Sequence, residues 1–324
     1  MPEDIGKKVS FVSIDETSAG QRLDNYLLKM LKGVPKSHIY RIVRKGEVRI
    51  NKGRASVKTR LQMGDIVRIP PVVMRQQANV AGLVAGQLRR LENSIIYEDK
   101  DFLILNKPTG MAVHGGSGIS HGVIETLRAM RPNEKGLELA HRLDRDTSGC
   151  LLIAKKRAAL TMFHERQRRG KVEKKYLALV DGHWGRKTSI TIDAPLHKNT
   201  LRGGERMVQV DPQGKDAITH FKIIESFADC MLVEALLETG RTHQIRVHLQ
   251  YANTPIIGDD KYGNTAINKA FRQRGLHRLF LHALSLSFMN TNSGKKIQVQ
   301  APLDDELSGA VDLLESENKS DSLQ

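Results

Sequence analysis

The chain has 324 residues, of which 40% are hydrophobic and 27% are charged, a composition typical of a soluble globular protein with about two domains. Its net charge of +15 favours a polyanionic partner, usually a nucleic acid. Two isolated cysteines argue against a disulfide framework or a CxxC zinc site, and no apolar stretch is long enough to span a membrane.

Residues 1–19 are expected to form an N-terminal extension ahead of the first domain. They begin MPEDIGKK, which has early acidic residues and lacks the apolar core of a secretory signal. We therefore expect a cytoplasmic protein without a membrane partner.

Positive charge is concentrated in residues 21–75, which carry 14 Lys or Arg against three Asp or Glu. The spacing of apolar residues predicts a helix over 22–28 and, after the break at Gly33-Val34-Pro35, a second helix with Ser37 as its N-cap. Short strands follow on either side of an expected turn at 51–53.

Two short basic helices followed by short strands resemble the S4 RNA-binding domain over residues 20–80, most specifically in GVPKSHIYRIVRKGEVRIN. A solvated basic face without a ligand is the alternative, but both helices and the turn are basic together. The expected RNA-binding residues of this domain are Arg22, Lys36, Ser37, Arg41, Arg44, Lys45, Arg49 and Lys52.

Residues 81–91 are expected to be a linker, and residues 92–305 a second domain. Strands are predicted over 102–105, 151–154, 176–180, 217–224, 231–237 and 297–300, and helices over 124–130 and 158–169. Because strands outnumber helices and are often close neighbours, we expect an α+β fold with a mixed, largely antiparallel sheet flanked by helices. Residues 306–324 should contain the end of a helix and a disordered, polar tail.

The segment HRLDRDTSG places Asp144 between Arg142 and Arg145, directly before a predicted buried strand. A surface ion-pair cluster is the ordinary explanation for such charges. Here Thr-Ser-Gly and a strand follow at once, so the loop should be held rigidly, as a site requires.

Two later segments also carry candidate residues. Tyr176 lies in KKYLALVDG on a predicted strand, where a tyrosine is most often a core residue. In GRTHQIRVH, Gly240 can turn the chain into a helix whose first turn is rich in donors. Arg241 and Arg246, five residues apart, can address a phosphate and a carboxylate separately.

These three segments occur in this order and together resemble the motifs of the RluA-type pseudouridine synthases over residues 92–305. The turn at 106–110, the loop HGGSG and Leu281-His282-Ala283 fit that family as well. Its members break the N1–C1′ bond of uridine, turn the base and join C5 to C1′. The reaction has no redox or phosphate-transfer step, so no metal or organic cofactor is expected, and the sequence lacks the GxGxxG and GxxxxGK[ST] motifs.

The resemblance implies that Asp144 is the catalytic carboxylate, acting as a nucleophile or as a base at C2′, and that Arg246 pairs with it. It implies that Tyr176 stacks on the uracil, that Ile245 packs on the other side, and that Arg142 fills the gap left by the flipped nucleotide. The implied substrate is 23S RNA of the large ribosomal subunit, and the implied state is a monomer. The remaining expected substrate-binding residues are Arg241, His243 and Gln244.

Three other functions compete with this prediction. HRLDRD shares letters with the kinase catalytic loop, but no VAIK strand or DFG segment accompanies it. A nucleoside glycosylase could use Asp144 and Asp146 as an acid–base pair, and it would release free base. A non-catalytic RNA-binding ribosome assembly factor would keep its biological role after Asp144→Ala.

Overall fold

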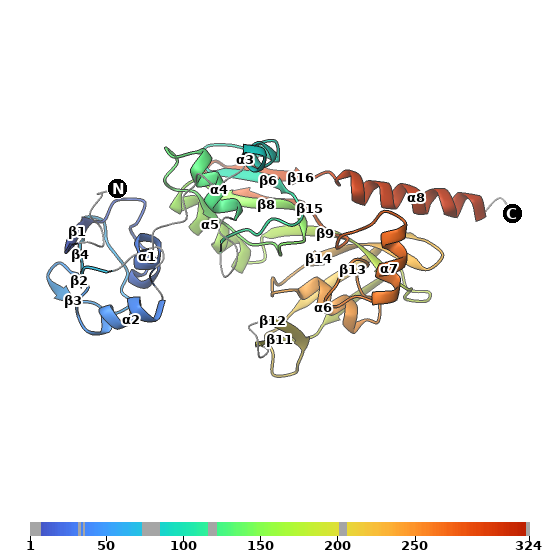
Figure 1. Ribbon diagram of the computed structural model, residues 1–324, viewed down its shortest axis with the longest axis horizontal. Helices are drawn as coiled ribbons and strands as arrows, with labels where there is room; N and C mark the ends of the chain where they lie inside the picture. Colours follow the sequence, from blue (N-terminus) through green and yellow to red (C-terminus); the bar gives the residue numbers. More distant parts are fainter. Residues whose placement is uncertain are drawn as a thin grey trace. The chain divides into compact units, whose positions relative to one another are not determined.

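The computed structural model describes residues 8–31, 34, 36–72, 85–115, 122–200 and 206–321, and the chain divides into two compact units, 1–84 and 85–324 (Figure 1). Each unit is described by itself. Among the described helices, none is both long enough and apolar enough to cross a membrane.

The small unit combines two helices with a four-stranded antiparallel sheet in the order β1-β4-β2-β3. Buried side chains of both helices and of β4, among them Leu23, Leu27, Ile39 and Val67, form a hydrophobic core of their own. Its elements are β1 (Ser10–Ser13), α1 (Leu23–Met30), α2 (Lys36–Arg44), β2 (Arg49–Ile50), β3 (Gly53–Arg54) and β4 (Ile66–Ile69).

This unit differs from expectation at its start. Residues 8–19 are not a separate extension, because β1 pairs with β4 and Ile14 is buried in the core. Ser37 lies inside α2 rather than at its N-cap, a shift within the usual uncertainty of helix ends. The expected turn is confirmed, since Asn51 and Lys52 both have positive φ, as a tight hairpin between β2 and β3 requires.

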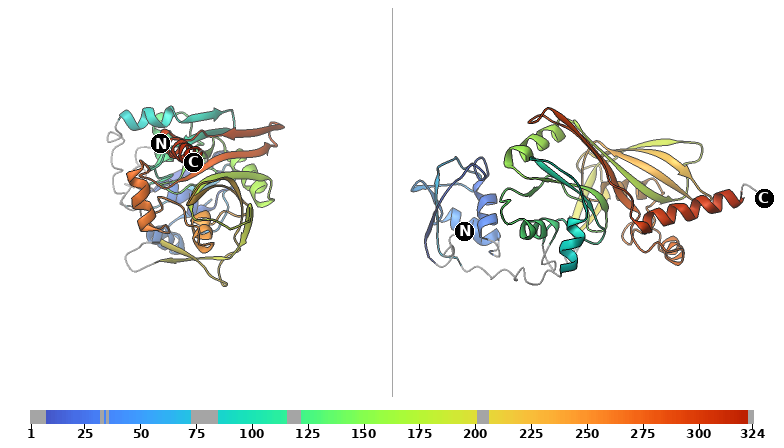
Figure 2. Two further views of the ribbon diagram at one scale, coloured as in Figure 1. Left: turned by 90° about the vertical axis from the view of Figure 1, so that its right-hand side faces the viewer. Right: turned by 90° about the horizontal axis from the view of Figure 1, so that it is seen from above.

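The large unit is built on a ten-stranded sheet, and Figure 2 shows this sheet twisting along its strand order. The order is β10-β13-β14-β9-β15-β8-β6-β5, with β16 beside β15, β7 beside β8, and a separate β11–β12 ribbon. The strands are β5 (Ile95–Glu98), β6 (Phe102–Lys107), β7 (Glu138–Leu139), β8 (Ser148–Ala154), β9 (Val172–Asp181), β10 (Ser189–Asp193), β11 (Leu196–Thr200), β12 (Arg206–Val210), β13 (Ile218–Ser226), β14 (Cys230–Leu237), β15 (Leu281–Asn290) and β16 (Lys295–Gln300).

Helices flank this sheet, with α6 packed against β13 (Figure 1). The helices are α3 (Ala85–Glu92), α4 (Val123–Met130), α5 (Arg157–Arg168), α6 (Gln244–Tyr251), α7 (Thr265–Gln273) and α8 (Asp305–Asp321). In the described sheet β8 and β15 are the parallel pair, and the other pairings are antiparallel. The predicted α+β fold with a mixed, largely antiparallel sheet is therefore confirmed.

Two segments expected to be irregular are helical. The proposed linker 81–91 overlaps α3, whose Leu91 is fully buried in the core of the large unit; residues 81–84 lie outside the described range. The proposed polar tail is largely α8, which buries Leu307, Ala310 and Leu314 along one side. In both cases a few buried side chains stabilise a helix whose overall composition is polar.

Candidate active site

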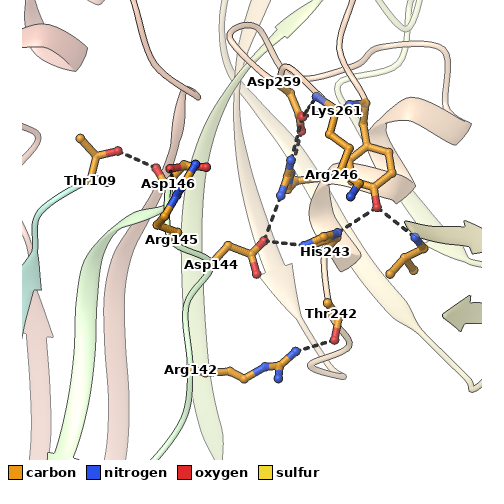
Figure 3. Close-up of polar contacts among 12 residues, drawn as sticks. Thr109, Arg142, Asp144, Arg145, Asp146, Thr242, His243, Arg246, Asp259 and Lys261 are labelled. Atoms are coloured by element: carbon orange, nitrogen blue, oxygen red, sulfur yellow. Dashed lines mark hydrogen bonds and ion pairs between the residues drawn. The ribbon is translucent and has the colours of Figure 1, made fainter. Parts of the chain in front are cut away.

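The loop at 141–147 enters β8, and side chains from a distant turn hold its backbone. Lys107, at the end of β6, donates a hydrogen bond of 2.9 Å to the carbonyl oxygen of Arg145. The hydroxyl of Thr109 donates one of 2.9 Å to the carbonyl oxygen of Asp146 (Figure 3). The loop is therefore anchored immediately after Asp144, as the sequence indicated.

Lys107 is fully buried, and its nitrogen also donates to the carbonyl oxygens of Pro108 and Met111, both at 2.9 Å. Burial lowers the pKa of Lys107 to about 7, and the nearby charge of Arg278 acts in the same direction. Three carbonyl acceptors require three N–H donors, which only the ammonium form supplies. The protonated lysine therefore holds the turn and the loop together.

Asp144 points from this loop toward the start of α6 (Figure 3). Its Oδ2 lies 3.3 Å from Nη1 of Arg246 and 3.8 Å from Nε2 of His243. The Asp144 side chain is 25% exposed, so its carboxylate stays accessible while facing two basic groups. The expected pairing of Arg246 with Asp144 is present in the structure.

Arg246 is fixed by a second carboxylate behind it. Its Nε and Nη2 donate to the two oxygens of Asp259 at 2.7 and 2.8 Å, and the Asp259 side chain is fully buried. Burial works to lower the pKa of Arg246, but the hydrogen bonds and charge of Asp259, and then Asp144, outweigh burial and raise it. Arg246 is thus permanently charged, and its two hydrogen bonds to Asp259 fix the orientation in which it contacts Asp144.

His243 caps α6 in a left-handed backbone conformation, with φ of +54°. Its Nδ1 lies 2.8 Å from the hydroxyl of Tyr262, which accepts a hydrogen bond of 3.0 Å from the backbone N–H of Val208. Burial lowers the pKa of His243, against the opposing effect of the Asp144 charge, so the ring favours its neutral form. If Tyr262 donates to Nδ1, the ring proton sits on Nε2 and faces Asp144.

A cavity of about 60 Å³ opens at the Asp144 carboxylate and is lined by Tyr176, Ile245 and Leu281. Tyr176 is 7% exposed, and among the described residues its hydroxyl has no hydrogen-bond partner. Burial, and then the charge of Asp144, raises the pKa of Tyr176, so the phenol stays neutral. Tyr176 is therefore both a buried strand residue and part of the cavity wall.

The other expected substrate-binding residues line the same cavity, but their side chains differ in availability. Arg142 is exposed and donates to the Thr242 hydroxyl at 2.5 Å, which links the Asp144 loop to the loop before α6. The Arg241 side chain is exposed and donates a hydrogen bond to the carbonyl oxygen of Asp216.

Gln244 also lines the cavity, and its amide is hydrogen-bonded within the protein. Its oxygen accepts from the backbone N–H of Arg241 and the hydroxyl of Thr239, at 2.9 and 2.8 Å. Its nitrogen donates to the carbonyl oxygen of Ile218 and the hydroxyl of Thr219, at 3.0 and 2.9 Å. Gln244 therefore fixes the loop that presents Arg241 and His243.

Sequence reasoning missed Asp259 and Tyr262, which hold Arg246 and His243. Both belong to the segment GDDKYG at 258–263, where Oδ1 of Asp259 also accepts from the backbone N–H groups of Lys261 and Tyr262. The available signal was a polar, glycine-flanked turn directly after the buried pair Ile256-Ile257.

The small unit, considered by itself, exposes most of its expected RNA-binding side chains. Those of Arg41, Arg44, Lys45, Arg49 and Lys52 are exposed, whereas those of Lys36 and Ser37 lie outside the described residues. Arg22 is partly committed, because it forms an ion pair of 2.7 Å with the buried Asp24.

The described part of the chain was compared with the requirements of metal and thiol sites. Within the described ranges, no group of three or more His, Cys, Asp or Glu side chains is placed to hold a metal ion. Cys150 and Cys230 are both buried as free thiols, and burial raises the pKa of each to about 12. Neither thiol is therefore prepared to act as a nucleophile.

Comparisons with known proteins identify relatives of this chain. A model of the family described as RNA pseudouridylate synthase matches residues 101–251, and a model of the S4 domain matches residues 21–67. A ribosomal large subunit pseudouridine synthase C of Pasteurella multocida (strain Pm70) is 51% identical over 98% of this chain and 97% of its own. Proteins of the same name from Haemophilus influenzae and Yersinia pestis are each 52% identical, over 96% and 92% of this chain and 96% and 93% of their own.

Solved structures share the fold of the large unit. Human RNA Pseudouridylate Synthase Domain Containing 1 superposes with a TM-score of 0.57 at 26% identity, covering 73% of this chain and 98% of its own. Human RNA Pseudouridylate Synthase Domain Containing 4 gives a TM-score of 0.58 at 24% identity, over 71% and 96%.

Proposed function

The chain belongs to the RNA pseudouridylate synthase family and isomerises uridine in RNA to pseudouridine, and we propose that its substrate is 23S RNA of the large ribosomal subunit. The names of its relatives and the S4 domain with its exposed basic residues support this substrate. The proposal includes action as a monomer in the cytoplasm, where such RNA would be available.

The observation that carries the residue assignment is the placement of Asp144. Its carboxylate faces a cavity that Tyr176 and Ile245 also line. It lies 3.3 Å from Arg246, whose guanidinium is held by Asp259. Uracil is flat and apolar on its faces, so Tyr176 and Ile245 suit the two sides of the ring. We assign Asp144 as the catalytic carboxylate on this basis.

Asp144 can act along two routes, and both need it ionised. As a nucleophile it bonds to C1′ of the sugar while the N1–C1′ bond breaks, or it adds to C6 of the base as the C5=C6 double bond opens, and the N1–C1′ bond then breaks in a later step. As a general base it removes the C2′ proton, which also allows the base to leave. Arg246 stabilises the ionised carboxylate in either route, and Asp259 keeps the guanidinium oriented.

Tyr176 fits the proton transfer that follows the new C5–C1′ bond, and His243 fits a positioning role beside Asp144. The reaction ends with loss of the C5 proton, which needs an acceptor near the base. The Tyr176 hydroxyl lies at the cavity and is not hydrogen-bonded to any described residue, so it suits assistance at C5. His243, neutral and held by Tyr262, helps fix the orientation of the Asp144 carboxylate.

A uridine inside folded RNA must leave its stack to enter this cavity, at a cost of a few kcal/mol. Arg142 lies at the exposed mouth of the site, and its side chain bridges to Thr242. We propose that substrate RNA displaces this bridge and that Arg142 then fills the place vacated by the flipped nucleotide. Arg241, at the same rim, is proposed to contact a phosphate.

The test is to map pseudouridines in ribosomal RNA from cells with and without this protein, complemented by wild type or Asp144→Asn. We expect specific sites to disappear in the deletion strain and to return only with the wild-type protein. An unchanged map in the deletion strain would refute the proposed substrate. Return of the sites with Asp144→Asn would instead favour a non-catalytic assembly role.

A further inference from the structure

A basic groove leads away from Asp144 across the face of the sheet beside α5. Its first part, of about 600 Å³, is lined by Asp144 and Tyr176 and by Arg168 and Lys174. Its second part, of about 630 Å³, shares Arg168 and Lys174 with the first and continues to Lys296. The groove is thus continuous with the catalytic cavity and carries an excess of positive charge.

Lys174 occupies the junction of the two parts. It lies two residues before Tyr176 on β9, and both side chains are buried on the same face of the strand. A Cβ added to Gly240 would stand 3.8 Å from the Lys174 nitrogen and 3.9 Å from Nε2 of Gln167. The Lys174 ammonium and the Gln167 amide at the end of α5 therefore both lie beside Gly240, which begins the GRTHQ loop.

Lys174 is 7% exposed, yet within the described ranges its ammonium has neither a hydrogen-bond partner nor an ion-pair partner. Burial lowers its pKa to about 8. The His141 ring nearby offers no counter-charge, since burial and then the Lys174 charge lower the His141 pKa to about 3. The Lys174 nitrogen still reaches the groove, because the buried side-chain nitrogen and oxygen atoms of the described residues that lack a partner do not include it. A largely desolvated cation without a counter-charge favours the binding of an anion.

We propose that Lys174 forms an anion subsite, with the Gln167 amide and the open space over Gly240, for a phosphodiester of the substrate RNA next to the target uridine. This inference rests on the proposed function, because it takes RNA as the ligand of the groove. The missing side chain at Gly240 lets a phosphate oxygen approach the loop closely, and the Gln167 amide adds a neutral donor.

The position of Lys174 specifies which phosphate it binds. The Cα atoms of residues two apart on one strand are separated by roughly 6.6 Å, so the backbone of Lys174 lies about that far from the backbone of Tyr176, the proposed base-stacking residue. That spacing fits a linkage directly flanking the target nucleotide better than a distant one. The more exposed Arg168, Lys171 and Lys296 are placed to follow the strand further along the groove.

The first experiment compares Lys174→Met with Lys175→Met in the full-length protein, using a short RNA that contains a mapped target uridine. Lys175 is the matched control, because it is adjacent on β9, faces the other side and pairs with Glu234 at 3.2 Å. For Lys174→Met we expect KM to rise about 10- to 100-fold with a smaller change in kcat. The slope of log affinity against log salt should fall by roughly 0.7–1. Lys175→Met should leave both quantities near the wild-type values.

The second experiment replaces single phosphodiesters around the uridine with neutral methylphosphonates. The wild-type protein should lose about 10- to 100-fold in affinity at one flanking position, and Lys174→Met should lose no more there. Equal sensitivity of the two proteins at every position, or an unchanged KM in Lys174→Met, would overturn the subsite. A wild-type protein that forms no pseudouridine in ribosomal RNA would instead refute the proposed function.

Discussion

The Asp144 carboxylate depends on the fixed geometry of Arg246, whose guanidinium contacts Asp144 through one nitrogen and Asp259 through the other two. Lysine carries the same charge but cannot make three directed contacts in one plane. We therefore expect Arg246→Lys to lower kcat about 100-fold or more while the protein stays folded. Single-turnover kinetics and circular dichroism test this. Arg272→Lys, at an exposed ion pair with Asp260, serves as the control, and normal turnover by folded Arg246→Lys would contradict the prediction.

Asp259 is expected to be a positioning residue with a structural cost. Asp259→Asn keeps the shape of the side chain but removes the charge that balances buried Arg246. Breaking a buried ion pair destabilises a protein by about 3–5 kcal/mol, so Tm should fall along with kcat. KM for RNA should change little, because Asp259 lies behind Arg246. A loss confined to KM would place Asp259 in substrate binding instead.

The two buried lysines of the large unit differ in their hydrogen-bond partners. Lys107 donates hydrogen bonds to three carbonyl oxygens, whereas Lys174 has no hydrogen-bond or ion-pair partner among the described residues. Since burial lowers the Lys174 pKa from 10.5 to about 8, the folded state loses the proton before the unfolded state does. Its charge therefore costs about 3 kcal/mol of stability below pH 8, and this cost disappears as the pH rises to 10.5.

Lys174→Met should accordingly be more stable than the wild type at pH 7, and the difference should shrink toward pH 10. Urea unfolding of both proteins at pH 7 and pH 10 measures this difference in the free energy of unfolding. The contributions of other titrating groups are the same in both proteins and cancel. If Lys174→Met is less stable than the wild type at pH 7, the lysine stabilises the fold through packing and its charge carries no cost that an anion would relieve.

At the scale of elements, the parallel pairing of β8 with β15 sets where the catalytic loop meets the sheet. Gly149 has φ of +102°, and a Cβ there would lie 2.3 Å from the carbonyl oxygen of Ala283. We expect Gly149→Ala to destabilise the protein by about 2–5 kcal/mol and to lower activity, because β8 must shift against β15. Gly185→Ala is the control, with positive φ but open space around it; equal Tm losses would contradict the role of the close approach.

Much of this architecture could be predicted from local sequence. The apolar runs of β6 and β8 indicated buried strands, and the order of three motifs indicated the family and the pairing of Asp144 with Arg246. The positions of Asp259 and Tyr262 could not be predicted, since they act through contacts that only the folded turn creates. The helix α3 was missed, and α8 continues beyond the helix end that was expected after residue 305, because the stability of both comes from a few buried side chains rather than from composition.

At the scale of the whole molecule, the two units have separate hydrophobic cores that share no residue. The large unit should therefore fold without the small one, provided that the truncation removes no residue of its hydrophobic core. Removal of residues 1–84 leaves α3 intact, whereas removal of 1–91 also deletes the fully buried Leu91. We expect residues 85–324 to unfold cooperatively, and residues 92–324 to be less stable by about 2–5 kcal/mol.

RNA binding should show what the small unit contributes beyond its own folding. If the full chain engages ~6–10 phosphates, its affinity falls roughly 10³–10⁵-fold between 50 and 200 mM salt. Residues 85–324 keep the catalytic cavity and its groove but lose the exposed basic residues of the small unit, so the salt slope should be shallower. Pseudouridine formation should persist on short RNA and weaken or move to other uridines on full-length ribosomal RNA. A truncated enzyme that modifies the same uridines at the same rate would show that the small unit has another role.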